Sequence, residues 1–368
     1  MTAPKPRPIR FVALLLTTLY PLYLLFPHPS LAEPLKVGMS LPLSGVNAAF
    51  GAAVKNGLDL ALADDPLLGQ RTHYVLEDNE YDAKKTLATC EKLRLTDQAD
   101  LIFVWGSQPC LAAAPLAERH RIPMICFSGD PKPEMPYVFS FNSPTADYAK
   151  PLADYLRLRS TEPWALLQAE MPFLQRMGAE IKTQLADKGK LVTEKTFAPD
   201  AQDFRSLITN IKSKLPSSLV LLMLPNQIAP FLRQAAGMDL KVQLLGTDTF
   251  SSTDAIKESK GLMEGALYAE MIISKDFQRR YRETFGTEDN LSFAANTFEF
   301  ALFVDRALNT LTHGVPSSRI IELLIGAAPQ GGKVTGGYTY INEPSQGQFF
   351  RFKIGLRRIK GLDWENVN

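Results

Sequence analysis

Short apolar segments alternate with longer amphipathic segments through most of this chain, and this alternation constrains the fold more than any other feature. One series runs from Leu35 to Phe127, and a second runs from about Thr145 to Gly246. Short apolar runs separated by single helical patterns indicate βαβ units, whose strands are parallel. The sequence therefore predicts an α/β protein with two series of parallel strands, hence two lobes.

The expected elements follow this order along the chain. In the first series we expect strands at 35–41, 73–77, 100–105 and 123–127, and helices at 48–63, 83–95 and 108–119. In the second we expect helices at 145–158, 172–188, 204–215 and 227–237, and strands at 164–168, 191–197, 218–224 and 242–246. The remainder is less regular, with helices expected at 277–285, 293–311 and 317–325, and strands at 338–341 and 348–354.

Length and charge narrow the class of protein. The chain has 368 residues, of which 45% are hydrophobic, enough for two ordinary domains with real cores. Its 40 basic and 39 acidic residues give a net charge of +1. This balance excludes the basic footprint of a nucleic-acid-binding protein.

The first 32 residues have the order of a secretory signal peptide. Three basic residues precede an apolar stretch from Phe11 to about Phe26, and Ser30-Leu31-Ala32 offers small residues for cleavage. The alternative is an uncleaved membrane anchor, but this stretch contains Pro21 and is shorter than the ~20 residues needed to span a bilayer. The sequence therefore predicts export to the periplasm.

Three cysteines leave one structural question open. Cys90 and Cys110 fall in successive expected helices and would pair in an oxidising compartment if those helices are neighbours. Sequence does not give the geometry that decides between a disulfide and two thiols. Cys126 lies in an apolar run and is expected to be a buried thiol.

The loops that follow the expected strands supply candidate ligand-binding residues. In open parallel sheets, ligands bind beyond the carboxyl ends of the strands, where helix N-termini present unpaired N–H groups. The candidates from these loops are Phe50, Ser107, Ser128, Gly129, Asp130, Phe173 and Asp248. Three have structural alternatives, because Ser107 and Asp248 also suit helix caps and Phe173 suits a core.

Motifs for catalysis or cofactor binding are missing from the sequence. It contains no GxGxxG or GxxxxGK[ST] phosphate loop, no GxSxG nucleophile elbow and no HExxH metal motif. We therefore expect no cofactor, no metal and no enzymatic activity.

Several segments resemble, in order, the type I periplasmic solute-binding proteins of ABC importers, specifically the leucine/isoleucine/valine-binding branch. Residues 35–45 (LKVGMSLPLSG) resemble the family's first strand and its GPLTG loop. Residues 50–61, 77–83, 112–125, 136–139, 197–204, 231–235 and 245–248 resemble further segments of that family. The resemblance covers most of residues 35–310.

This resemblance implies a fold and a set of partners. It implies two Rossmann-like lobes joined by three crossovers, with a ligand bound between them. It places residues 35–141 and 252–328 in lobe 1, and residues 143–250 and 333–368 in lobe 2. It also implies a small-molecule ligand, an ABC permease at the inner membrane, a monomeric state and no nucleic acid.

The resemblance also assigns roles to the candidate residues. Ser107 matches a serine that binds the ligand α-carboxylate, and Ser128, Gly129 and Asp130 occupy a second turn that holds it. Asp248 corresponds to the acid that meets the α-ammonium, and Phe173 and Phe50 correspond to aromatic contacts. A carboxylate at helix N-termini and an ammonium beside an acid both agree with ordinary charge-assisted hydrogen bonding.

Three departures widen the range of ligands. Asp130 stands where the family has Ser or Thr, residues 224–226 lack the family's aromatic, and the stretch from Ala269 to Asp276 is short. The expected function is therefore to bind a small polar or zwitterionic solute, an amino acid or a related amide or amine, for an ABC importer. Two alternatives stay open: a ligand sensor that signals to a membrane receptor, kinase or regulator, and an exported enzyme.

Overall fold

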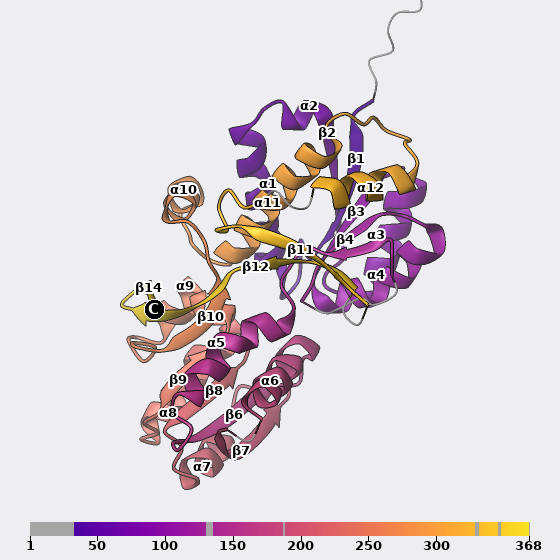
Figure 1. The fold of residues 1–368 in the computed structure, drawn as a ribbon. Helices are drawn as coiled ribbons and strands as arrows, with labels where there is room; N and C mark the ends of the chain where they lie inside the picture. Colours follow the sequence, from indigo (N-terminus) through magenta and orange to yellow (C-terminus); the bar gives the residue numbers. More distant parts are fainter. Residues whose placement is uncertain (1–32, 130–134, 187, 328–330, 345–346, 368) are drawn as a thin grey trace, which may run out of the picture. The chain divides into compact units, whose positions relative to one another are not determined.

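The computed structural model describes residues 33–129, 135–186, 188–327, 331–344 and 347–367 (Figure 1). Residues 34–368 form one compact unit, whose described strands make two seven-stranded sheets. The signal peptide predicted for residues 1–32 lies outside the described residues. Within the described ranges, no helix has the length and apolar character that a membrane crossing requires.

The first sheet has the strand order β11-β12-β5-β4-β3-β1-β2. Its strands are β1 (Leu35–Leu41), β2 (Thr72–Asp78), β3 (Leu101–Trp105), β4 (Met124–Phe127), β5 (Val138–Ser140), β11 (Tyr338–Glu343) and β12 (Gly347–Phe352). All of these pairings are parallel except that of β11 with β12. Strand β3 is buried along its whole length because helices cover both faces of the sheet.

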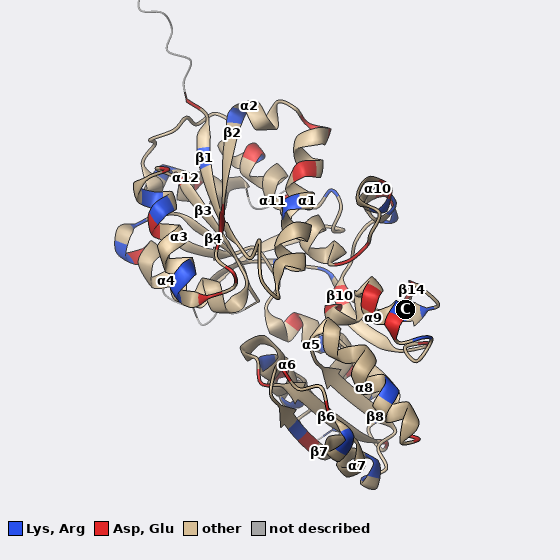
Figure 2. Ribbon diagram, turned by 180° about the vertical axis from the view of Figure 1, so that it is seen from behind, with Lys and Arg blue, Asp and Glu red and all other residues tan. Residues whose placement is uncertain are grey.

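Two sets of helices cover the first sheet. One face packs against α1 (Ala48–Asp64), α2 (Leu68–Arg71), α10 (Lys275–Phe285), α11 (Leu291–Leu308) and α12 (Ser317–Ala327). The other face packs against α3 (Ala83–Leu95) and α4 (Ser107–His120). Charged residues lie mainly on helices and loops, whereas β3 and β4 contain none (Figure 2). The apolar segments of the sequence are therefore strands buried between two layers of helices, and the amphipathic segments are the helices that cover them.

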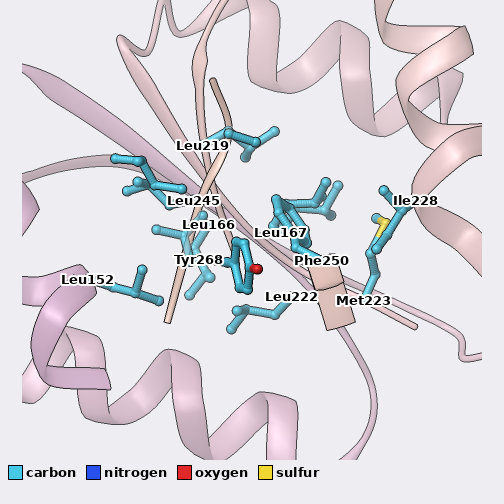
Figure 3. Close-up of a cluster of buried hydrophobic side chains, with 14 of the residues drawn as sticks. Leu152, Leu166, Leu167, Leu219, Leu222, Met223, Ile228, Leu245, Phe250 and Tyr268 are labelled. Carbon is cyan, nitrogen blue, oxygen red and sulfur yellow. The ribbon is translucent and has the colours of Figure 1, made fainter. Parts of the chain in front are cut away.

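The second sheet has the order β14-β13-β10-β9-β8-β6-β7. Its strands are β6 (Pro163–Ala169), β7 (Lys190–Phe197), β8 (Ser218–Leu222), β9 (Gln243–Gly246), β10 (Leu267–Met271), β13 (Ile354–Lys360) and β14 (Asp363–Val367). Its helices are α5 (Thr145–Arg157), α6 (Pro172–Leu185), α7 (Arg205–Ser213), α8 (Pro225–Gly237), a 3-10 helix (Asp248–Ser251) and α9 (Thr253–Glu258). Leucines from several strands surround the ring of Tyr268 in the core of this lobe (Figure 3).

The chain passes between the two sheets three times. The passages follow β5, β10 and β12, as the strand order of the sheets requires. The first and third passages are bonded to each other, since the Ser143 hydroxyl donates to Phe352 O (3.1 Å) and accepts from Phe352 N (2.7 Å). The second and third are joined by Ile272 N donating to Lys353 O (2.8 Å). The predicted fold, two α/β lobes joined by three crossovers, is confirmed.

The sheets correct the expected lobe ranges in two places. Residues 252–271 were expected in lobe 1, but α9 packs in the second core and β10 pairs with β9. Residues 338–352 were expected in lobe 2, but β11 and β12 extend the first sheet. Phe350 and Phe352 explain the second correction, because their rings pack on Phe141 of the first lobe.

Strands β10, β13 and β14 were not anticipated from the sequence. Strand β10 reads Leu-Tyr-Ala-Glu-Met and carries an acid in its interior, which is untypical of a buried strand. The strand is nevertheless buried throughout, because Glu270 forms an ion pair with Arg357 of the neighbouring β13. A contact between distant residues therefore overrides the local pattern.

The structure also decides the cysteine question. The three cysteines all lie in the described part of the chain and are thiols, with no disulfide between Cys90 and Cys110. The Cys110 thiol donates to Val104 O (3.2 Å), whereas Cys90 interacts with Ser40 and Cys126. The two side chains therefore approach different strands. Burial is the largest cause that raises the pKa of Cys90, to about 12, so this thiol is unreactive.

We expect a thiol titration to reflect this arrangement. All three cysteines are buried, so the native protein should react slowly with a thiol reagent. The protein unfolded without reductant should titrate three thiols. A titration of one thiol under those conditions would instead indicate the Cys90–Cys110 disulfide.

Candidate ligand-binding site

One cleft in the described structure gathers residues from both lobes. It contains about 870 Å³ of empty space, part of it open to solvent, and its lining is mostly apolar. Six of the seven predicted site residues line it: Phe50, Ser107, Ser128, Gly129, Phe173 and Asp248. The seventh, Asp130, lies outside the described residues. The structure thus brings the candidates together, and their contact with a ligand stays a prediction.

Two serines form the polar end of the cleft in lobe 1. Ser107 is the first residue of α4 and Ser128 follows β4, and their hydroxyl oxygens lie 3.2 Å apart. Gly106 occupies the N-cap position of α4, so the cap residue supplies no side-chain oxygen to the first N–H groups of the helix. Such N–H groups and paired hydroxyls suit an anionic or carbonyl oxygen of a ligand.

Gly129 continues this polar end and is held close to the first crossover. Its carbonyl accepts from Thr145 N (3.0 Å) at the start of α5. A Cβ atom at this position would lie 2.9 Å from Ser143 O, which is closer than side chains tolerate. The turn therefore requires glycine, and it places the polar end of the cleft directly against the first crossover.

An aromatic cluster forms the apolar wall of the cleft in lobe 1. The ring of Trp105 lies 5.2 Å from Phe50, 5.1 Å from Phe293, 5.9 Å from Phe127 and 5.9 Å from Tyr81. All five residues line the cleft. Sequence reasoning identified only Phe50. Trp105 and Phe127 are the last residues of β3 and β4, so their position at the carboxyl ends of strands could have identified them as site residues. Phe293 lies on α11, far away in the chain, and nothing in the sequence pattern marks it as a site residue.

Tyr81 reaches this wall through an unusual turn. Glu80 and Tyr81 both have positive φ (49° and 61°), a conformation that side chains other than glycine rarely adopt. Asp78 stabilises the turn by accepting from Glu80 N (3.0 Å) and from Leu43 N (2.8 Å) of the loop after β1. Asn79 accepts from Tyr81 N (2.8 Å). The strained turn is therefore fixed, and it directs Tyr81 to the cleft.

The first crossover contributes a further polar group. Asn142 Oδ1 accepts from Ser143 N and from the Tyr148 hydroxyl, each at 2.9 Å. These two donors fix the amide orientation, so the Asn142 side chain keeps its Nδ2 donor for other partners. Asn142 and Tyr148 both line the cleft. From the sequence, Asn142 fell between the two series and Tyr148 fell in the helix expected at 145–158, and neither was identified as a site residue.

Asp248 is the acid of the second lobe. It begins the 3-10 helix after β9 and is partly exposed to the cleft. Removal from bulk water and repulsion by Glu270 raise its pKa to about 7, and the hydroxyl of Thr247 partly opposes this shift. Asp248 therefore exchanges a proton near neutral pH and favours a partner that carries positive charge.

The rest of the second-lobe wall is apolar. Met171, Phe173, Leu174 and Leu224 line it. Phe173 is half-buried near the start of α6, lines the cleft and also packs against the second core, and its contact with a ligand stays a prediction. Leu224 stands where the resemblance would place an aromatic ring. In this chain the aromatic surface of the cleft is concentrated in the first lobe instead.

The described part of the chain contains no side-chain cluster of the kind that binds a metal ion. Among the residues that the structure describes, no group of three or more His, Cys, Asp or Glu side chains could hold a metal ion. Asp248 is the one charged residue among the described residues that line the cleft. This arrangement is suited to holding a small molecule.

A family model decides the relationship. The model described as periplasmic binding protein matches residues 34–324. The chain belongs to this family. The predicted resemblance to the type I members is thereby confirmed, and the family implies a periplasmic location.

Solved structures of this family share the fold. A solute-binding protein of R. palustris in complex with benzoate superposes with a TM-score of 0.78 at 19% identity, covering 91% of this chain and 96% of its own. A leucine-binding protein of Thermotoga maritima gives a TM-score of 0.77 at 18% identity, covering 91% and 98%. A substrate-binding protein of Streptococcus pneumoniae in complex with isoleucine gives 0.74 at 18% identity, covering 91% and 99%. These periplasmic binding proteins establish the architecture.

Proposed function

We propose that this periplasmic binding protein is the substrate-binding component of an ABC importer. Residues 1–32 would direct its export as a cleaved signal peptide, and a permease at the inner membrane would receive the ligand from the monomeric protein. Its ligand would be a small polar or zwitterionic solute, an amino acid or a related amide or amine. The solute-binding neighbours that bind benzoate and isoleucine support a small organic solute with an apolar body.

One observation supports this proposal most strongly. Within a single cleft, the paired hydroxyls of Ser107 and Ser128 at the start of α4 belong to one lobe, and the Asp248 carboxyl belongs to the other. A zwitterion placed between them would set its carboxylate at the helix N-terminus and its ammonium at Asp248. The aromatic wall around Trp105 would then cover its apolar body.

This division of the site provides a mechanism for closure. Each lobe offers half of the polar contacts, so only a ligand that bridges the lobes gains both halves. Ligand binding therefore favours the closed arrangement by the difference in affinity between the two states. The hydrogen bonds between the crossovers, at Ser143 and Ile272, would keep the three passages together during this motion.

A thermal-shift screen tests the proposal. Amino acids, amides, polyamines and aromatic acids would be added singly to the mature protein. A ligand that binds only the folded state raises the melting temperature with its concentration. A selective shift for one class would support the function, and solution scattering should then show a more compact molecule. A cleft that binds none of these compounds would contradict it.

Replacing Ser107 by Ala should weaken binding of a carboxylate ligand. The serine hydroxyl supplies a hydrogen bond to a charged oxygen, and losing such a bond costs about 1–3 kcal/mol. Titration calorimetry with the screened ligand measures the loss. The matched control is Ser206→Ala, which removes an exposed hydroxyl from α7. Equal affinities of both variants would remove Ser107 from the site.

A further inference from the structure

A second acid, Glu270, lies directly behind the cleft in lobe 2. Strands β9 and β10 are parallel, with Gly246 opposite Tyr268 in their register. Asp248 and Glu270 each lie two residues beyond this pair, so both acids lie at the carboxyl end of adjacent strands. Glu270 is 1% exposed and does not itself line the cleft. The register therefore places a buried carboxyl beside the acid that faces the ligand.

Arg357 is the counter-charge of Glu270. Its guanidinium forms an ion pair with the Glu270 carboxylate, donates to Met271 O (2.8 Å) and stacks 3.7 Å from the centre of the Trp364 ring. Arg357 is 1% exposed, and its guanidinium is the positive charge in contact with Glu270. Burial raises the pKa of Glu270, but this fixed cation favours its ionised form. Glu270, and not Asp248, is therefore the acid that Arg357 pairs with.

Two hydroxyls connect Glu270 to the cleft. Ser292 at the start of α11 and Ser251 at the end of the 3-10 helix both line the cleft, and both act to lower the pKa of the Glu270 carboxyl. The Ser251 hydroxyl itself donates to Asp248 O (2.7 Å). Ser292 belongs to the first lobe and Ser251 to the second. Glu270 thus influences both sides of the cleft without touching its contents.

The charges around the two acids do not balance. Glu270 and Asp248 contribute two carboxyls, and Arg357 contributes one positive charge. Tyr148 on α5 and Tyr268 on β10 also face this region, and burial raises the pKa of both phenols, so they stay neutral.

Other charged groups lie farther from Asp248 and Glu270. Asp147 on α5 is paired with Arg351, Asp363 of β14 acts on Tyr268, and Lys275 lies over the ring of Trp364. No Lys or Arg is among the described residues that line the cleft. One negative charge of the acid pair therefore needs either a proton or a cation from the ligand.

We propose that Glu270 is a positioning residue that makes the cleft selective for a ligand with a positively charged head group, acting through Asp248, Ser251 and Ser292. The inference rests on the proposed binding function and goes beyond it by assigning the charge selectivity to a residue that does not line the cleft. Without a ligand, burial and repulsion by Glu270 together disfavour the ionised form of Asp248 and raise its pKa to about 7. A ligand ammonium replaces the Asp248 proton and restores the charge balance.

Matched pairs of probes test the charge preference in the unaltered protein. L-Phenylalanine and 3-phenylpropionate differ by one ammonium group, as do L-leucine and 4-methylpentanoate. Calorimetry at pH 8 should show the ammonium member binding at least tenfold more tightly within a pair. Equal or tighter binding of the deaminated acids, with binding otherwise intact, would overturn this inference alone. If neither member of a pair bound, and no compound in the thermal-shift screen raised the melting temperature, the proposed function would be overturned as well.

The variant Glu270→Gln tests whether Glu270 causes the preference for the ammonium-bearing member of each pair. It should lower the affinity ratio within each pair at least fivefold, because the negative field behind the ammonium is removed. A merely structural role would weaken both members alike and leave the ratio unchanged, which would contradict the proposal. Glu258→Gln is the control, since it removes an exposed acid from α9 of the same lobe.

A second variant keeps the proposal testable if Glu270→Gln fails to fold. Glu270→Gln leaves Arg357 buried without its counter-charge, which destabilises proteins strongly. The double variant Glu270→Gln, Arg357→Gln removes both charges together. Its ratio should also fall, because Glu270 is the member of the ion pair that interacts with Asp248 and the two serines. An unchanged ratio in this folded double variant would equally overturn the proposal.

Discussion

Replacing Asp248 by Ala is expected to abolish measurable binding of an ammonium-bearing ligand while the protein stays folded. Truncating one partner of a desolvated charge pair costs about 2–5 kcal/mol, so the affinity should fall roughly 30-fold or more. Calorimetry with the ligand found by screening measures this loss. Asp254→Ala is the matched control, because it removes an exposed acid from α9. Unchanged affinity of the Asp248 variant would remove this residue from the site.

The same substitution should change the pH dependence of stability. The folded protein holds the Asp248 proton up to about pH 7, whereas a carboxyl in the unfolded chain releases it near 3.8. Between these values the folded state binds more protons, so this group makes the free energy of unfolding fall as the pH rises. Asp248→Ala removes that contribution. Its stability relative to the unaltered protein should therefore be higher at pH 8 than at pH 4.5, as urea unfolding at both pH values will show.

Replacing Gly57 by Ala should cause a large loss of stability. A Cβ atom at Gly57 of α1 would lie 2.1 Å from Ala294 O and 2.8 Å from Ala294 C of α11, both backbone atoms. Backbone of a packed helix cannot move aside locally, so the two helices must separate. Overpacking of this kind costs about 1–3 kcal/mol and occasionally more, and we expect about 3 kcal/mol.

Urea unfolding measures this effect, and the chain provides a control. Gly326 of α12 is exposed, and a Cβ atom there would meet no atom within 4 Å. Gly326→Ala should therefore leave stability unchanged or raise it by up to about 1 kcal/mol, through helix propensity. If both alanine variants unfolded at the same urea concentration, the close contact between α1 and α11 would not be a determinant of stability.

The sequence predicted the fold class because local patterns carry it. Strands such as β3 and β8 are short, apolar apart from Ser218, and flanked by amphipathic helices. This pattern has one common outcome in α/β proteins. The same pattern locates the loops that follow these strands, and these loops supply candidate site residues. Ser107 and Asp248 were identified because parallel strands present their carboxyl ends at the same edge.

Other parts of the site could not be predicted because distant segments build them. Phe293 reaches the cleft from α11, whose position depends on the second crossover. Glu270 is an acid inside a buried strand, and only its pairing with Arg357 of β13 makes that placement acceptable. The lobe membership of 338–352 depends equally on rings of Phe141 and Phe350 that are far apart in the chain.

The crossovers also affect how this molecule can be divided. Residues after Gly337 supply β11 and β12 to one sheet and β13 and β14 to the other, so each half completes its edge with the end of the chain. A premature stop at that glycine would damage both halves at once. Neither half exists as an uninterrupted gene segment, and expressing one alone would require joining separate fragments with an artificial connection.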